Sequence, residues 1–534
     1  MSDNANHSHY MDLIMFRFGV YLYFLLSAGV CFASTVGNSH EFFHSIKLKK
    51  DQYITGEFSF SQPFIKAELI DENERLVRVL AKQQNTFKLY LLAQRDQQYK
   101  VRVISANKNL ATINLSEPIS QPAVSDNETL LSPIMQSLVT RLKGNNKVKV
   151  VDDFWRNVEK EGTPLVEYEQ TDALVTFLWR GARHNVRLFG APFGSHQDLE
   201  KIEGTDIWFK TYRLPTDSLI SYQLAPDVPH VPNQPRASRI AIMATKQQDP
   251  LNPTTWQFEG TDKYATHSIL TLKDTKHSPY LRDVSESFYS LTQHTIESVR
   301  LNNTRDIAVY KHKDATPISP TILFFDGKNY QSKLKVPNTL TNLVNDKKIP
   351  PVNAVFVSNV SRKTRGQELP PNPDFAWFMA NELMPWLTKK GLSPSAQNTV
   401  LSGSSFGGLA SMYVAMQYPD VFGNVLSQSG SFWWSPREGS KEQTEPQWLT
   451  RKIARDNYKK LSIYMNAGVF ETGYFTIDIL ESNRHLRDVL NAKGYTVKYH
   501  EFSGGHDSYV WRNELADGLI YLLTNRKIIN DEVK

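Results

Sequence analysis

The second half of the sequence alternates short apolar runs of strand length with longer segments of helical composition. The apolar runs are Thr321–Phe325, Ala354–Val357, Thr399–Ser402, Val425–Ser427, Leu461–Met465 and Val497–Phe502. The helix-length segments are Asp374–Leu387, Gly407–Gln417, Phe475–Lys493 and Trp511–Thr524. Parallel strands need a long crossover connection, usually a helix, so this alternation predicts a mostly parallel sheet with helices on both faces. We therefore expect an α/β domain over residues 286–534.

The first half of the chain has a different pattern, dominated by short alternating runs of apolar and polar residues. Between His40 and Leu115 these runs are separated by polar or turn residues, which predicts an accessory β-sandwich domain over residues 35–122. A helix is predicted over Ser132–Leu142, and further strands follow it up to about Tyr222. A second sandwich-like domain is therefore expected over residues 123–285, so that two such domains precede the α/β domain.

The amino terminus has the pattern of an export signal. Arg17 precedes the mostly apolar run Phe18–Ala33, and small residues occupy positions 31 and 33 before a possible cleavage site. We expect residues 1–34 to be a signal peptide and the mature protein to be exported, most simply to a periplasm, without stable membrane insertion. The alternative is a retained membrane anchor, for which the apolar run is slightly short.

Charge and cysteine content exclude several classes of protein. Among the 534 residues, 61 Lys and Arg oppose 55 Asp and Glu, a net charge of +6 that suits an anionic ligand but falls short of a nucleic-acid-binding profile. Cys31 is the only cysteine, which rules out a disulfide scaffold and cysteine-based zinc sites. We expect no metal site and no nucleic-acid partner.

The segment Gly403–Gly408, with the sequence Gly-Ser-Ser-Phe-Gly-Gly, lies between an expected strand and an expected helix. This is a G-x-S-x-G pattern in the strand-to-helix context that a nucleophile elbow requires. The sharp turn lifts the Ser405 hydroxyl out of the sheet and directs helical N–H groups toward a developing oxyanion. Ser405 is therefore the predicted nucleophile of an α/β hydrolase. Ser404 is the alternative, and it lacks the flanking glycine spacing.

A serine nucleophile needs a general base, and His506 is the strongest candidate. It follows Gly504 and Gly505 directly after the last apolar run, where a loop can reach across the top of the sheet. His500 is the alternative, but it lies within the strand, where alternation could turn it away from the site.

The acid of a triad is expected between the serine and the histidine. Glu471 follows the strand Leu461–Met465 by a short loop, and would hold the imidazole in the useful tautomer. Asp478 and Glu481 are alternatives that lie further on in an expected helix, whereas Asp507 is simply adjacent to His506.

Two neighbouring loops complete the predicted site. Backbone N–H groups at Gly327 or Lys328, after an early strand, are expected to form an oxyanion hole with the N–H of Phe406. Trp433 and Trp434 follow the strand after the elbow helix, at the sheet edge where α/β proteins bind ligands. These two rings are expected to contact the ligand, or alternatively to form part of the rim or the core.

From Phe154 to about Leu523 the sequence resembles the enterochelin (enterobactin) esterases, which are esterase D-like α/β hydrolases. The resemblance rests on strings of residues in both later domains: Thr176–Arg180, Gly204–Trp208, Asp249–Pro253, Arg365–Leu369, Ser404–Leu409, Ser427–Trp434 and Gly504–Asp507. The second-domain strings are the specific ones, because many esterase D-like enzymes share the elbow and the Gly-Gly-His. The export signal resembles the periplasmic branch of the family, and the first sandwich is additional to the usual two-domain form.

The resemblance implies hydrolysis of the trilactone esters of a catecholate siderophore by acyl-enzyme chemistry at Ser405. No protein cofactor is implied, because any iron is carried by the substrate. A ferric tris-catecholate is trianionic, so Arg362, Arg365 and Lys328 are candidate electrostatic partners. The alternative for Arg365 is a buried pair with Glu368 or another acid.

Two other functions remain compatible with the sequence. A feruloyl or acetyl carbohydrate esterase could use the same scaffold, with the first sandwich as a glycan-binding module, because a fold does not fix a substrate. A non-catalytic ferric-siderophore-binding protein is the other alternative, although pure binding needs no nucleophile elbow.

Overall fold

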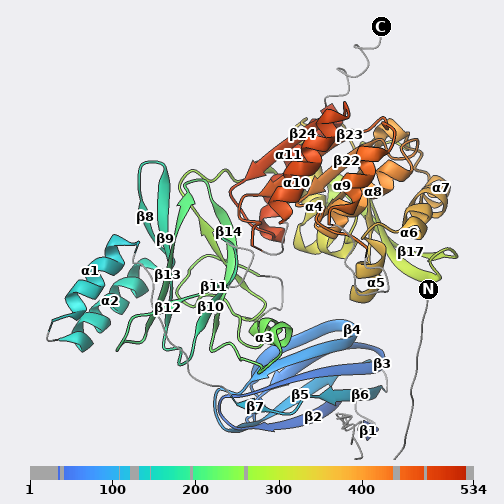
Figure 1. Ribbon diagram of the computed structural model, residues 1–534. Helices are drawn as coiled ribbons and strands as arrows, with labels where there is room; N and C mark the ends of the chain where they lie inside the picture. Colours follow the sequence, from blue (N-terminus) through green and yellow to red (C-terminus); the bar gives the residue numbers. More distant parts are fainter. Residues whose placement is uncertain are drawn as a thin grey trace, which may run out of the picture.

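The computed structural model describes residues 34–35, 41–106, 109–120, 131–144, 146–192, 197–257, 262–436, 446–473 and 478–524. Three sheet-containing regions follow one another along the chain, coloured blue, teal to green, and yellow to red in Figure 1. The predicted signal peptide lies outside the described residues apart from position 34, and the predicted boundary at 122/123 also lies outside them. Among the described residues, no helix combines the length and apolar character needed to cross a membrane.

The first region forms one seven-stranded sheet in which the long strand β3 belongs to two layers. Its strands are β1 (Ser34–Thr35), β2 (Glu41–Leu48), β3 (Gln52–Ile70), β4 (Leu76–Leu92), β5 (Gln97–Ile104), β6 (Leu110–Leu115) and β7 (Ile119–Ser120). The first part of β3 pairs with β6 and the last part pairs with β5, with a register irregularity between Ser59 and Phe64. The two layers enclose one core that includes the stacked rings of Phe58 and Phe87, 4.8 Å apart.

The second region is a sandwich of two antiparallel sheets. One has the order β12 (Glu200–Lys201), β13 (Ile207–Pro215), β9 (Asp172–Arg180) and β8 (Leu165–Tyr168). The other has the order β11 (Gln197–Asp198), β10 (Val186–Gly190), β14 (Leu219–Pro226), β16 (His267–Thr271) and β15 (Thr255–Trp256). Phe177 packs edge-on against Tyr222 in the core between the two sheets.

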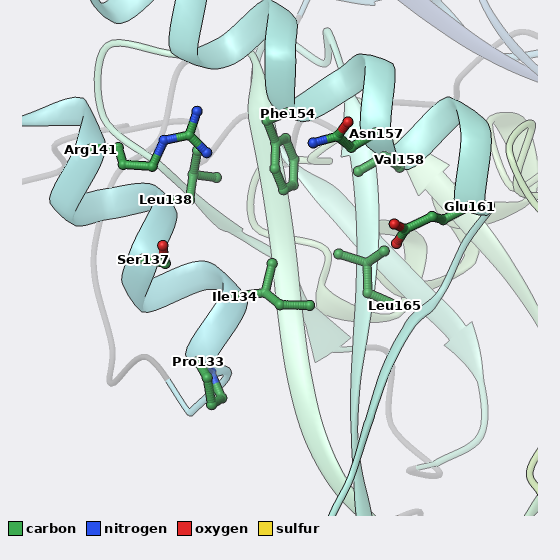
Figure 2. A pocket seen from close by; sticks show the side chains of 10 residues that line it. All are labelled: Pro133, Ile134, Ser137, Leu138, Arg141, Phe154, Asn157, Val158, Glu161 and Leu165. Carbon is green, nitrogen blue, oxygen red and sulfur yellow. The ribbon is translucent and has the colours of Figure 1, made fainter.

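Two helices, α1 (Pro133–Leu142) and α2 (Lys147–Glu161), pack on the outer face of the four-stranded sheet. The side chain of Ser132 caps α1 by accepting the N–H of Met135, and the helix lies where the sequence predicts one. A cavity of about 390 Å³ lies between α1, α2 and β8 (Figure 2). No predicted site residue is among those that line it.

The third region is built on an eight-stranded sheet. Its order is β17 (Tyr289–Ser298), β18 (Asn303–His312), β20 (Asn353–Val357), β19 (Thr321–Phe324), β21 (Thr399–Ser404), β22 (Asn424–Gln428), β23 (Ser462–Gly468) and β24 (Thr496–Phe502). The six strands from β20 to β24 in this order are parallel, and β17 and β18 add an antiparallel edge. The apolar runs of the sequence therefore predicted the parallel strands, whereas the edge hairpin was missed.

Helices cover both faces of this sheet because its central strands are apolar at successive positions. Ile322 and Phe324 belong to one core and Leu323 to the other, as expected for alternating side chains. The first core is covered by α4 (Val336–Asn345) and α11 (Ser508–Thr524). The second is covered by α6 (Pro373–Phe378), α7 (Met384–Lys389), α8 (Phe406–Gln417), α9 (Trp448–Arg455) and α10 (Ile479–Ala492). This arrangement confirms an α/β-hydrolase-type domain behind two sandwich-like regions.

Candidate active site

Ser405 occupies a tight turn between β21 and α8. Its backbone angles are φ 58° and ψ −122°, which is an unusual conformation for a residue with a side chain. The turn depends on the neighbouring glycine, because a Cβ atom on Gly403 would lie 2.5 Å from the carbonyl carbon of Gly407. The N–H of Phe406 is the first of α8, so it has no acceptor within the helix. This geometry is that of a nucleophile elbow, whereas Ser404 is a buried residue of β21.

His506 and Glu471 lie together at the same edge of the sheet. Nδ1 of His506, on the loop after β24, is 3.3 Å from Oε1 of Glu471, which follows β23. Glu471 is fully buried, and among the described residues its Oε2 has no hydrogen-bond partner. The ring of Trp511 packs edge-on against His506 with 4.8 Å between centroids. A buried carboxylate paired with an imidazole is the arrangement that fixes a histidine tautomer.

The alternative residues have other surroundings. Asp507 accepts the N–H groups of Tyr509 and Val510 at the start of α11, and burial raises its pKa to about 6. His500 lies 3.5 Å from Glu514 on α11, and this contact raises its pKa. Asp478 precedes α10 and accepts the N–H of Gly473.

One neighbour of the elbow was not assigned a role from the sequence. Ser431, on the loop after β22, places its Oγ 3.3 Å from Oγ of Ser405 and donates its N–H to the Ser405 carbonyl oxygen. The string Ser429-Gly430-Ser431 was visible, but no spacing rule links it to an elbow 26 residues earlier. The Ser405 hydroxyl thus has a hydrogen-bond partner in Ser431, and the His506 imidazole has one in Glu471.

The loop after β19 lies beside the elbow, since β19 and β21 are parallel neighbours. Helical backbone begins at Gly327, so the N–H groups of Gly327 and Lys328 open a helix as that of Phe406 does. A Cβ atom on Gly327 would lie 2.6 Å from the carbonyl carbon of Phe356, which excludes a side chain there. Two adjacent helix starts thus supply the N–H groups suited to an oxyanion hole.

Arg365 on α5 (Arg362–Glu368) is held by Asp326 rather than by Glu368. Its Nε and Nη2 donate to the two Asp326 oxygens at 2.6 and 2.8 Å. Burial lowers the pKa of Arg365, but the hydrogen bonds and charge of Asp326 outweigh it, so the net shift is upward. The guanidinium lies 5.8 Å from the centroid of the Phe406 ring. Arg365 therefore forms an ion pair with an acid other than Glu368, as the alternative prediction states. Its guanidinium nevertheless lies next to Phe406 of the elbow.

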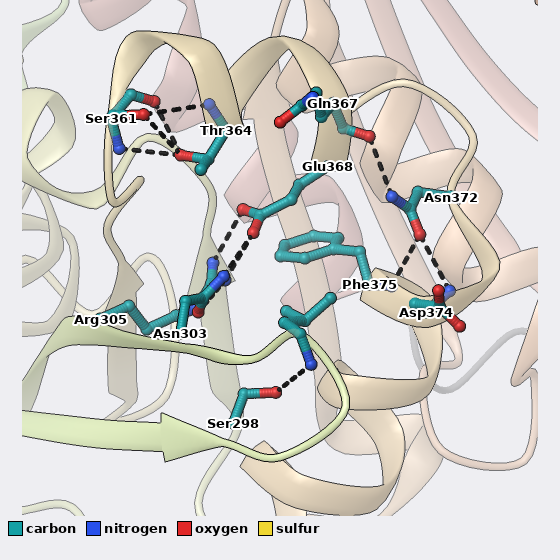
Figure 3. Close-up of polar contacts among 11 residues, drawn as sticks. Ser298, Asn303, Arg305, Ser361, Thr364, Gln367, Glu368, Asn372, Asp374 and Phe375 are labelled. Atoms are coloured by element: carbon teal, nitrogen blue, oxygen red, sulfur yellow. Dashed lines mark hydrogen bonds and ion pairs between the residues drawn. The ribbon is translucent and has the colours of Figure 1, made fainter.

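Glu368 has a different partner, shown in Figure 3. Arg305 on β18 donates two hydrogen bonds to its carboxylate, at 2.9 and 3.2 Å, and Asn303 adds a third at 3.0 Å. Arg305 is 2% exposed. Because this pair is buried below α5, it holds the helix that carries Arg365 against the sheet.

The remaining predicted binding residues lie at different depths. Arg362 is exposed at the start of α5, and Lys328 extends its side chain to Asp306 at 2.8 Å. Trp433 is half-buried, with its ring 6.1 Å from that of Phe406. Trp434 packs instead against Trp448 and the core. Trp433 is therefore placed to line the site, whereas Trp434 serves packing.

The second sandwich contacts the loop that carries His506. The N–H of Leu219 on β14 donates to the Ser503 carbonyl oxygen at 2.9 Å, and Phe470 packs against the sandwich core. A Cβ atom on Gly505 would lie 2.7 Å from Cβ of Ala191. The sequence did not predict this contact, which makes the sandwich part of the frame of the site.

Titratable side chains elsewhere give no indication of a metal centre. Within the parts of the chain that the structure describes, no group of three or more His, Cys, Asp or Glu side chains is placed to hold one ion. The expectation that the protein carries no cofactor stays a prediction.

Comparisons with known proteins agree with this architecture. The family model described as putative esterase matches residues 298–522, and the model described as enterochelin esterase, N-terminal, matches residues 174–280. An iron(III) enterobactin esterase from Escherichia coli is 31% identical over 340 residues, covering 61% of this chain and 82% of that protein. An iron(III) salmochelin esterase from the same species is 28% identical over 392 residues, covering 69% and 92%.

A solved structure shows the same likeness. The enterobactin esterase from Shigella flexneri, crystallised in the presence of enterobactin, is 26% identical, with a TM-score of 0.54 over 70% of this chain and 97% of that one. The matches span both the second sandwich and the α/β domain, in the order found here. The chain is a carboxylic ester hydrolase and belongs to the enterochelin esterase family.

Proposed function

We propose that this protein is a serine esterase that cleaves the trilactone esters of a catecholate siderophore, in its ferric form or without iron. The observation that carries the proposal is Ser405 at a strained elbow, with His506 paired to the buried Glu471 at the same sheet edge. Relatives named for iron(III) enterobactin and iron(III) salmochelin support the substrate class. Ester cleavage opens the macrocycle and weakens its hold on Fe(III).

The chemistry follows from the placement of these groups. Oγ of Ser405 attacks a lactone carbonyl carbon while His506 takes the hydroxyl proton. The N–H groups of Phe406 and of Gly327 or Lys328 stabilise the oxyanion of the tetrahedral intermediate. Its collapse breaks the ester C–O bond, and the alkoxide leaves with the proton from His506. Water, activated by the same imidazole, then hydrolyses the acyl-enzyme and restores Ser405.

Glu471 acts through the histidine. Its carboxylate keeps the Nδ1 proton of His506 in place and stabilises the imidazolium that forms on proton transfer. We expect Glu471→Gln to lower kcat by about 10²–10⁴-fold with a small change in KM, because substrate binding does not use this residue. The measurement is steady-state kinetics on an aryl ester, with Glu481→Gln on the surface of α10 as the matched control.

The substrate-binding groups follow from charge and position. Arg365, oriented by Asp326 and next to Phe406, and the ring of Trp433 are the closest to the elbow. Arg362 and Lys328 contribute positive charge at the rim, where they steer a trianionic complex toward the site. Iron enters only as part of the substrate, and the protein itself needs no cofactor.

The site of action is proposed from the leader-like segment. Residues 1–34 would direct export, so the esterase would work outside the cytoplasm, most simply in a periplasm. Amino-terminal sequencing of the protein from the exported fraction of its host tests this. A mature amino terminus near residue 35 supports export with cleavage, whereas full-length protein in the cytoplasm contradicts it.

Product analysis decides between this function and its alternatives. Wild-type protein and Ser405→Ala are incubated with iron-free and ferric enterobactin, and dihydroxybenzoylserine products are separated by chromatography. Products from the wild type alone support the proposal. Activity only on feruloyl or acetyl sugars favours a carbohydrate esterase, and tight siderophore binding without hydrolysis of any ester favours a binding protein.

A further inference from the structure

Cations and aromatic rings cluster where the second sandwich meets the α/β domain. Nζ of Lys333 lies 5.1 Å from the centroid of the Trp256 ring, and the guanidinium carbon of Arg512 lies 5.3 Å from it. The same guanidinium lies 4.2 Å from the centroid of the Tyr509 ring. Trp256 is on β15 of the sandwich, whereas the other three residues belong to the α/β domain. We call Lys333, Arg512, Trp256 and Tyr509 the junction cluster.

The junction cluster borders the catalytic groups on two sides. Lys333 ends the helical turn that starts at the oxyanion loop, at Gly327. Arg512 directly follows Trp511, whose ring packs against His506. The cluster is therefore connected to the oxyanion loop by one helical turn and to the catalytic histidine by one aromatic contact.

Two buried groups of the sandwich, Lys246 and His267, respond to the charge of Lys333 in the cluster. The buried Lys246 points its Nζ at Gln223, 2.6 Å from Oε1, and lies near enough to Arg78 and Lys333 to be affected by their charges. Burial, and next the charges of Arg78 and Lys333, lower the pKa of Lys246 to about 7. Burial, and next Lys246 and Lys333, lower the pKa of His267 to about 3.

Two carboxylates of the described residues lie near Lys333 and Lys246. Asp507 faces Lys333 and Asp262 faces Lys246, and burial raises the pKa of Asp507 to about 6. Among the described residues, Arg512 forms no ion pair with a carboxylate, and its buried Nε has no hydrogen-bond acceptor. A guanidinium stacked on two rings, with an unused donor, is suited to an anionic planar ligand.

We propose that the junction cluster is a subsite for one anionic catecholate arm of the substrate, held while an ester of the same molecule reaches Ser405. The inference rests on the proposed function and adds to it a binding site formed jointly by the sandwich and the α/β domain. Arg512 and Lys333 supply charge to the catecholate oxygens, and the rings of Trp256 and Tyr509 hold these two cations in place. Because a trianionic complex has several such arms, a subsite away from the elbow raises affinity without entering the chemistry.

The test compares a charged substrate with a neutral one. For Arg512→Gln, and separately for Lys333→Gln, kcat/KM is measured on ferric enterobactin and on p-nitrophenyl acetate. We expect the ratio of the first to the second to fall about tenfold in each variant, mainly through KM, and Arg512→Lys to recover part of the loss. Arg300→Gln is the matched control, because Arg300 also lies over a ring, that of Trp377 at 5.7 Å, on the edge-hairpin side of the domain.

The outcomes separate this inference from the proposed function. If the wild type cleaves ferric enterobactin and the ratio is unchanged in both variants, the subsite is wrong and the esterase assignment stands. If the wild type cleaves no siderophore ester, binding of ferric enterobactin to Ser405→Ala, followed by tryptophan fluorescence, still tests the cluster. Binding about tenfold weaker in the added Arg512→Gln variant supports the subsite, and unchanged binding overturns it.

Discussion

The second sandwich contacts both of the other regions, and the two junctions differ in the partners of their charged side chains. Toward the first region it uses a small apolar cluster that includes Tyr53, Leu92 and Val231, and an ion pair between Arg183 and Asp51. Toward the α/β domain it uses close backbone contacts and the cation-rich junction cluster. At the first junction Arg183 is paired with a carboxylate of the other region, as expected for a contact that only holds domains together. Where the junction adjoins the catalytic loop, Arg512 lies over two rings and has no carboxylate partner among the described residues, which suits ligand binding.

Among changes at the two junctions, the largest effect is expected from disturbing the close contact beside His506. Gly505→Ala should lower kcat about 100-fold, because its new Cβ would press on Ala191 and displace the adjacent His506 from its productive position. Adding Ala191→Gly removes the facing Cβ and should restore part of the rate. Steady-state kinetics on an aryl ester measures both, and a double variant as slow as the single one would count against this steric account.

A pH-dependent stability effect is expected at the same junction. Burial raises the folded-state pKa of Asp507 to about 6, so its neutral form stabilises the fold, and this contribution is lost as the pH rises through about 6. Asp507→Asn cannot ionise and keeps a side-chain oxygen for the N–H groups of Tyr509 and Val510. Its stability relative to wild type should therefore increase between pH 4.5 and pH 7.5 in urea unfolding. A difference independent of pH would contradict the raised pKa.

The smallest effect is expected at the junction with the first region. Arg183→Ala removes the ion pairs with Asp51 and with Asp227 and should lower the free energy of unfolding by about 1 kcal/mol, since Arg183 and Asp51 are partly exposed. Hydrolysis of ferric enterobactin should stay at the wild-type rate. Arg213→Ala, which removes an exposed pair with Glu169, is the control for a general loss of surface charge. A selective loss of siderophore hydrolysis in Arg183→Ala would contradict the proposal that only the junction with the α/β domain takes part in substrate binding.

The parts of the site that are local in sequence could be predicted. The elbow around Ser405 follows β21, which is buried at every position, and such strands give continuous apolar runs. The loop of His506 follows β24, a half-exposed strand at the end of the sheet, and was recognised by the two glycines before the histidine. Strand β17 was missed because it is polar and mostly exposed, whereas β18 contains the short buried run Ile307–Tyr310, which the sequence analysis did not identify. The boundaries of the expected helix Asp374–Leu387 were also blurred, because α6 and α7 are joined by a π-helical turn, Met379–Leu383.

The parts that depend on distant partners could not be predicted. Asp326 and Arg365 are 39 positions apart, and the resemblance could suggest Arg365 but not its partner. Asp206, in a second-domain string that resembles the family, holds Trp155 and Arg180 and therefore stabilises the sandwich. The junction cluster draws residues from positions 256 to 512, and no spacing rule covers such a distance.

The central claim is that Ser405 is the nucleophile of a siderophore esterase, and covalent labelling tests it most directly. The protein is treated with a fluorophosphonate, with and without ferric enterobactin, and fragment masses locate the adduct. We predict a single adduct on Ser405, slowed by the siderophore in proportion to its occupancy of the site. An adduct on Ser404 or Ser431, or labelling of Ser405 at the same rate in the presence of saturating siderophore, would contradict the account.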